Sequence, residues 1–190
     1  MFVSPSEAEQ VVNGCLIKRR TNCPGINLSN ANLTRSNLAN GNFEGADLSG
    51  ANLSGDRITE ANLINANLSH SNLSETNLSE THLNNANLFR ANLAKADLSQ
   101  STLPNVDLRD ANLAGANLSL ANLMGADLSG ANAKGAGLVM ASLVGANLSR
   151  VDLTEATLIG ADLHNAILKD TKFCKTTMPD KSINNNNCPK

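Results

Sequence analysis

The sequence predicts an all-β solenoid, because a five-residue phrase recurs from Ile26 to Met178 without one insertion or deletion. A large apolar residue, nearly always leucine, occupies every fifth position, and a small residue, usually alanine, stands two places before it. Asn or Asp separates the two, which gives the pattern A(N/D)Lxx. A short fixed period of this kind is typical of architectures that stack one unit on the next.

The period excludes both ordinary amphipathic elements. In an α-helix five residues turn the chain by about 500°, so the leucine stripe would drift around the helix axis. In a flat strand five is an odd step, so alternate leucines would face opposite sides of the sheet. The pattern works if the chain bends after every five residues, so that each leucine returns to face one interior axis.

Composition narrows the class of protein further. The 190-residue chain fits one domain and has no Trp or Tyr, so its core has to come from repeated Leu and Ala. Its formal net charge is -2, from 17 acidic and 15 basic residues, which argues against nucleic-acid binding and against a strongly acidic mimic of nucleic acid. The sequence has no apolar run of membrane-spanning length and no signal peptide, so we expect no membrane partner and, as written, a cytoplasmic protein.

The A(N/D)Lxx phrase resembles that of the pentapeptide-repeat proteins, which are abundant in cyanobacteria, and the resemblance extends over most of the chain. It implies a right-handed quadrilateral parallel β-helix in which four phrases, about 20 residues, form one coil. With strands about 4.8 Å apart, the array should contain about 8 coils and measure roughly 37 Å. Opposite charges 20 positions apart support this coil length. The pairs are Arg90 with Asp110, Arg150 with Asp170, Glu75 with Lys95, and Glu155 with Lys175.

The polar residues of the phrase are expected to be structural. Side-chain amides 20 positions apart would stack in a column and hydrogen-bond along the axis. One such column contains Asn32, Asn52, Asn72, Asn92, Asn112 and Asn132. Two defects interrupt the core: Asp56 replaces a small inward residue, and Ala133 replaces a leucine. A buried carboxylate is costly without partners, so we expect Asp56 to bond nearby backbone or Arg57.

Three regions follow from these patterns. Residues 1–25 form an N-terminal capping segment, with a short α-helix over residues 4–14 that begins at Ser4-Pro5 and ends at Asn13-Gly14. Residues 26–178 form the repeat array. Residues 179–190 form a C-terminal cap or tail, where Pro179 stops further strand pairing.

The four cysteines fall in two pairs at opposite ends of the chain: Cys15 with Cys23, and Cys174 with Cys188. A rod of the implied length separates its ends far beyond disulfide reach, so each cysteine can pair only with its local neighbour. Cys23 also falls in the inward frame and could instead be a buried thiol. Disulfides would favour an oxidising compartment, such as the periplasm or the thylakoid lumen if a leader was removed.

One surface feature stands out, because apolar residues replace the usual polar ones at outward positions. On the 20-residue grid these residues stack at what we expect to be one corner of the rod. They are Leu120, Met124, Val139, Met140, Val144 and Ile159. A contiguous apolar patch often marks an interaction site, although isolated apolar residues are also tolerated on surfaces.

We find no pattern typical of catalysis, a cofactor or a metal, since His70, His82 and His164 are scattered over the grid. The sequence therefore favours a non-catalytic structural or protein-interaction module, with an unknown protein partner and possibly a homodimer. The contrasting hypothesis comes from the resemblance: some family members mimic duplex DNA, bind topoisomerases such as gyrase, and protect them from inhibitors. Those members rely on an acidic surface, which basic residues interrupt in this chain. The interrupting residues are Lys95, Arg109, Lys134 and Arg150.

Overall fold

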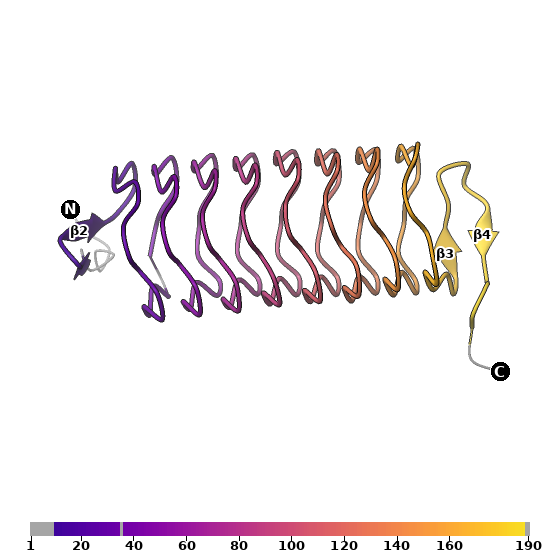
Figure 1. Ribbon diagram of the computed structural model, residues 1–190, viewed down its shortest axis with the longest axis horizontal. Helices are drawn as coiled ribbons and strands as arrows, with labels where there is room; N and C mark the ends of the chain where they lie inside the picture. The colour runs from indigo at the N-terminus through magenta and orange to yellow at the C-terminus, as the bar shows by residue number, and fades with distance from the viewer. Residues whose placement is uncertain (1–9, 35, 189–190) are drawn as a thin grey trace, which may run out of the picture.

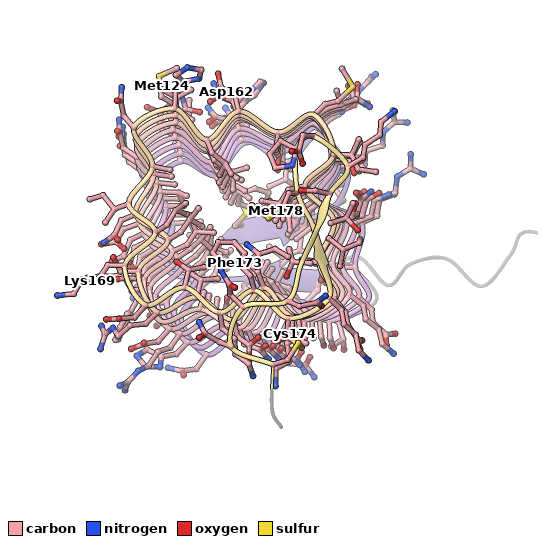
Figure 2. All side chains as sticks on the ribbon, turned by 90° about the vertical axis from the view of Figure 1, so that its right-hand side faces the viewer. Met124, Asp162, Lys169, Phe173, Cys174 and Met178 are labelled. Carbon is pink, nitrogen blue, oxygen red and sulfur yellow. A yellow bond between two sulfur atoms is a disulfide. The ribbon has the colours of Figure 1, made fainter. Side chains whose placement is uncertain are left out.

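The computed structural model describes residues 10–34 and 36–188, which wind into a rod of stacked coils (Figure 1). Parallel β-bridges join residues 20 positions apart, from the pair Asn22–Asn42 to the pair Thr157–Thr177. One turn of the coil therefore takes 20 residues, or four phrases. Seen along the rod axis, the coil has four sides (Figure 2). These features confirm the expected β-solenoid.

Each phrase supplies one side of the coil and one corner. The middle residue of the side forms the β-bridge, and the last residue of the phrase turns the corner in the left-handed backbone region. Every fifth described residue from Arg20 to Lys175 has a φ between 53° and 75°. Glycine and asparagine adopt this conformation most easily, which explains why both are frequent at the corners.

The inward leucines and small residues fill the rod. Leu103, for example, is fully buried, and its N–H donates to the carbonyl of Asn122 in the next coil at 2.7 Å. The predicted amide ladder is confirmed from Asn52 to Asn132, with each Nδ2 donating to the Oδ1 of the Asn 20 positions earlier at 3.0 to 3.2 Å. Buried Asp56 accepts a hydrogen bond from the backbone N–H of Ser36 at 3.1 Å, so the expected backbone partner is also confirmed.

The charge pairs predicted from the 20-residue grid are confirmed in three of four cases. Arg90 lies 3.7 Å from Asp110, Lys95 lies 3.6 Å from Glu75, and Lys175 lies 3.5 Å from Glu155. The fourth pair, Arg150 and Asp170, occupies one corner in adjacent coils, where Arg150 N–H donates to the Lys169 carbonyl at 2.8 Å, but the two side chains form no ion pair. All of these groups are well exposed, and long exposed side chains lose entropy when they are held together.

The predicted N-terminal helix is wrong over the part that the structure describes. Strand β1 (Gln10–Val12) pairs antiparallel with β2 (Cys15–Ile17) in a hairpin. Asn13 and Gly14 form its two-residue turn, with φ values of 49° and 81°. An Asn-Gly turn with positive φ at both positions matches the twist of a hairpin, and this local preference prevails over the helix signals. Residues 4–9 of the predicted helix lie outside the described residues.

A second hairpin covers part of the C-terminal end. Strand β3 (Thr176–Thr177) pairs antiparallel with β4 (Ile183–Asn184), and the chain reverses between them at Pro179–Lys181. Both predicted disulfides are present, Cys15–Cys23 at one end of the rod and Cys174–Cys188 at the other. In the described parts of the chain, no helix is long and apolar enough to span a membrane.

A neutral apolar face as the candidate functional site

The six apolar residues singled out in the sequence lie at two adjacent corners of the rod, not at one as expected. Leu120, Met140 and their neighbours occupy the corner before one side, whereas Met124 and Val144 occupy the corner after it. The reason is the coil geometry, because four or five residues along the chain lead across a whole side. The apolar residues therefore flank one side of the rod.

The first corner carries the most exposed of these side chains. Leu120 and Met140 are 54% and 63% exposed, and Val139 and Ile159 beside them are half-buried. The backbone ladder fixes their spacing, since Leu120 N–H donates to the Val139 carbonyl and Met140 N–H donates to the Ile159 carbonyl, both at 2.9 Å. Leu120 and Met140 thus stand in successive coils, one above the other.

The second corner repeats this arrangement across the side. Met124 is 49% exposed, and Val144 and Pro104 in the adjacent coils are half-buried. Between the two corners stand only short polar side chains, and Asn122 Oδ1 accepts a hydrogen bond from the backbone N–H of Met124 at 3.1 Å. The polar residues of this side are Thr102, Asn122 and Ser142.

Most of this side of the rod also lacks charge, and the exception is Asp162, which is bridged to Ser142 at the C-terminal end of the side. We name it the neutral face and define it by residues 99–105, 119–125, 139–145 and 159–161, which contain no Lys, Arg, Asp or Glu. The charged residues between positions 99 and 161 all lie on the other three sides. They are Asp107, Arg109, Asp110, Asp127, Lys134, Arg150, Asp152 and Glu155. An apolar surface depleted of charge resembles the centre of a protein interface more than an average surface.

On the other sides, several carboxylates are engaged within the chain. Arg109 donates to both oxygens of Asp107, at 2.9 and 2.7 Å, and this side-chain hydrogen bonding lowers the pKa of Asp107. The hydroxyl and backbone N–H of Ser49 lower the pKa of Asp47 in the same way. These contacts fit the structural role predicted for both residues.

Sequence reasoning missed a stack around Phe89. The edge of the His70 ring meets the Phe89 ring at 5.5 Å between centroids, and the guanidinium groups of Arg90 and Arg109 lie 4.9 and 5.5 Å from the Phe89 centroid. The 20-residue grid could have shown it, because these residues fill one corner in successive coils. Cation–aromatic contacts of this type stabilise neighbouring coils, so the ring is already covered by groups of the same chain.

The three histidines remain apart from one another. His82 Nδ1 lies 3.1 Å from Thr102 Oγ1, His164 Nδ1 lies 2.8 Å from Asp162 Oδ1, and His70 contacts Phe89. Among the residues with described positions, no group of three or more His, Cys, Asp or Glu side chains could hold a metal ion. The geometry therefore directs attention to surfaces rather than to a reaction centre.

Comparison with solved structures returns pentapeptide-repeat proteins. HetL, from the cyanobacterium Nostoc and involved in heterocyst differentiation regulation, is 28% identical, with 87% of this chain and 90% of HetL covered and a TM-score of 0.30. QnrB1, a plasmid-mediated fluoroquinolone resistance protein, is 19% identical, with 83% and 77% covered and a TM-score of 0.49. An Arabidopsis thaliana thylakoid-lumen protein is 34% identical, with 56% and 68% covered and a TM-score of 0.26.

The family comparison extends over nearly the whole array. No curated protein matches the chain. The sequence model described as pentapeptide repeats matches in 8 copies. The matched residues are 19–55, 57–93, 91–130, 105–138 and 141–178. The chain therefore belongs to the pentapeptide-repeat family.

Proposed function

We propose that the chain is a non-catalytic interaction rod, right-handed and of about eight coils, that binds a protein partner on its neutral face. The observation that carries this proposal is the exposure of Leu120 and Met140 at a corner where most coils place Gly, Asn or a charged residue. Both side chains also sit on a left-handed backbone, with φ values of 62° and 56°. Folding gains little from an exposed apolar side chain at such a position.

The chemistry of the face defines the partner. Burial of apolar surface stabilises a complex by about 25 cal/mol per Å², and no charge has to be desolvated at the centre of this face. Methionine adapts to irregular surfaces, which suits Met124 and Met140 as contact residues. We therefore expect a protein partner with an uncharged apolar strip that fits between the two corners.

The test begins with a photo-crosslinking amino acid in place of Met140, used in extract of the source cell. The protein that it captures is then purified and titrated calorimetrically with the wild type and with the double variant Leu120→Asn/Met140→Asn. We expect the double variant to lose about tenfold or more in affinity, the effect of removing central apolar contacts. Asn tolerates the left-handed corner, so the fold should persist.

The matched control is Arg150→Asn, since Arg150 occupies the same corner place on the opposite side of the rod, with a φ of 59°. Its affinity should equal that of the wild type. Equal binding by the double variant would contradict the proposal. Sedimentation of the wild type and both variants tests self-association. If the wild type and Arg150→Asn form a dimer and the double variant does not, the face binds a second copy of the chain, and this result would also contradict the proposal of a different protein partner.

The charge distribution argues against mimicry of duplex DNA. Such a mimic needs a continuous acidic surface, whereas Arg90, Lys95, Arg109 and Lys134 project from successive coils at two corners of this rod. Several of the acidic groups there are paired with these cations. The interaction rod therefore remains the function that the surface supports best.

We also infer that the protein works in an oxidising compartment, such as the periplasm or the thylakoid lumen, rather than in the cytoplasm. The two disulfides support this inference, because thiol-reducing systems keep most cytosolic cysteines unpaired.

A further inference from the structure

The coil that ends the rod is only half covered by the chain that follows it. After Met178 the chain reverses at Pro179–Lys181, where Met178 N–H donates to the Ser182 carbonyl, and β4 returns antiparallel to β3. The chain therefore turns away from the side that begins at Ala161. Among the residues that the structure describes, none forms a coil above the two sides made by residues 161–170. We name these residues the bare edge.

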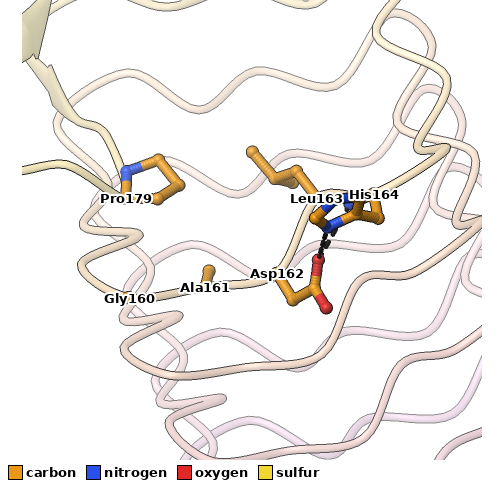
Figure 3. Close-up of a pocket in the computed structure, with 6 residues that line it drawn as sticks. All are labelled: Gly160, Ala161, Asp162, Leu163, His164 and Pro179. Atoms are coloured by element: carbon orange, nitrogen blue, oxygen red, sulfur yellow. Dashed lines mark hydrogen bonds and ion pairs between the residues drawn. The ribbon is translucent and has the colours of Figure 1, made fainter.

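The apolar side chains of the bare edge are more exposed than the equivalent side chains one coil earlier. Leu168 is 38% exposed and Leu163 is half-buried, whereas Leu148 and Leu143 below them are fully buried. Ile167, in the middle of the second side, is 52% exposed. An open hollow of about 550 Å³ lies against the first side (Figure 3). Its lining residues are Gly160, Ala161, Asp162, Leu163, His164 and Pro179.

In the bare edge, the backbone groups that would bond a following coil also differ from those of earlier coils. In every earlier coil the leucine N–H donates to the next coil, as Leu143 does to the Asp162 carbonyl at 2.8 Å. Within the described part of the chain, the N–H groups of Leu163, Asn165 and Leu168 make no such bond. The carbonyls of Ala161 and Ala166 accept none from a following coil. Unpaired backbone groups of this kind form a template for strand addition.

The tail covers the other two sides of the same coil and shows what the edge requires. Asn185 Oδ1 accepts a hydrogen bond from Lys175 N–H at 3.1 Å, and Asn187 Nδ2 donates to the Thr171 carbonyl at 3.4 Å. The Cys174–Cys188 disulfide holds the tail at this place (Figure 2). The covered half thus receives an acceptor for the corner N–H of Lys175 and a donor for the carbonyl of Thr171.

We propose that the bare edge binds an extended segment of another polypeptide, which adds to the rod as a partial coil. The binding segment runs parallel to residues 161–170 and carries two apolar residues five positions apart, each with a small residue two places before it. Its apolar side chains cover Leu163 and Leu168, and its carbonyls accept from their N–H groups. This contact continues the coil-on-coil interface that is repeated along the whole rod.

A second copy of this chain, joined end to end, does not satisfy the edge. Each phrase presents two N–H donors and one carbonyl in the direction of the C-terminus, so two such edges facing each other leave donors opposite donors. The other end of the rod offers the complementary carbonyls, but its cap already bonds two of them on adjacent sides of the coil. There Asn13 Nδ2 donates to the Asn27 carbonyl at 2.7 Å, and Gln10 Nε2 donates to the Asn32 carbonyl at 3.4 Å.

The test uses a synthetic peptide that copies residues 141–150, because this segment has Ala and Leu at the required spacing. Backbone amide NMR spectra of the intact protein are followed as the peptide is added up to about 1 mM, a range that detects weak binding. We expect saturable shifts, and amide exchange slowed about tenfold, at Leu163, Asn165 and Leu168. The amides of Leu143 and Leu148, which are already bonded, should not change.

Two controls define the binding mode. A peptide with Asp in place of both leucines should not bind. In the protein, Leu168→Pro removes a donor that has no partner in the free rod, so coils 21–160 should keep their spectrum while the peptide binds at least about tenfold more weakly. Absence of shifts at the bare edge would overturn the proposal. The proposal would also be overturned if these amides were protected from exchange in the protein without peptide and the protein had the mass of a dimer. A second copy of the chain would then occupy the edge.

Discussion

At the scale of single residues, one backbone requirement governs much of the surface. The corner residue of each phrase is left-handed, so a side chain there stands outward and meets little of its own coil. Gly or Asn is favourable at this place, and the ion-paired Lys95 and Arg90 find partners in the adjacent coil. Leu120 and Met140 have neither advantage. The departures from the pattern, rather than the pattern, therefore identify the candidate site.

The engaged carboxylates lead to a prediction about pH. The pKa values of Asp47, Asp107 and Asp152 are lowered in the folded chain, so their contribution to stability is complete above the pKa of the unfolded state and is lost as pH falls through the folded pKa. We expect the free energy of unfolding to decrease as pH falls below about 4. Denaturant titrations at several pH values measure this decrease.

The variant Asp107→Asn isolates one contribution. Asn is the usual residue of this column, so the turn should persist, and the loss at pH 7 should stay below about 1 kcal/mol. The decrease at low pH should be smaller than in the wild type. Arg109→Lys, which keeps the charge but loses the two-pronged contact, serves as the comparison. Identical pH dependence in all three proteins would contradict the role of the Asp107–Arg109 pair.

At the scale of elements, the two hairpins were the least predictable parts of the chain. The helix prediction failed at residues 10–14, although Asn13-Gly14 between two apolar pairs is itself a strong hairpin signal. The disulfide pairs could be predicted, because the length of the rod leaves each cysteine only one neighbour. The bare edge could not, since it depends on the direction that the chain takes after Pro179, which no periodicity specifies.

The C-terminal disulfide should stabilise the tail more than the coils beneath it. In the variant Cys174→Ala/Cys188→Ala, we expect faster amide exchange at Lys175, whose acceptor is Asn185 of the tail. Thr177 is the internal control, because its N–H donates to the Ala156 carbonyl in the coil below. Closing a 14-residue loop corresponds to about 3 kcal/mol in the chain-entropy account, an upper limit for the loss. Unchanged exchange at Lys175 would exclude this role.

At the scale of the whole molecule, the fold was largely predictable because each coil repeats the same local requirements. The inward leucines followed from one period and from the need to return each leucine to the axis. The 20-residue turn, and with it the amide ladder, was implied by the family resemblance and supported by the charge pairs. The candidate face was located only in part. Its residues were recognised, but their division between two corners becomes clear only when each side of the coil is traced in turn.

Because contacts are made only between successive coils, equal substitutions should differ in cost along one column of the rod. Leu103→Ala removes a fully buried side chain between two covered coils and should cost about 2 to 5 kcal/mol of unfolding free energy. Leu163→Ala stands on the same side at the bare edge, where the side chain is half-buried, and should cost less than half of that. Denaturant titration gives both values, and equal costs would contradict this description.

The unbroken 20-residue turn also restricts how such a chain can change in length. Removal of a single phrase would rotate everything after it by a quarter turn relative to everything before it. The core would tolerate this change, because every phrase presents the same leucine inward. The surface would not, since Leu120 and Met140 would no longer share a corner if a phrase between them were lost. Lineages that depend on an aligned face should therefore gain or lose whole coils, whereas those that need only a spacer are free to vary by single phrases.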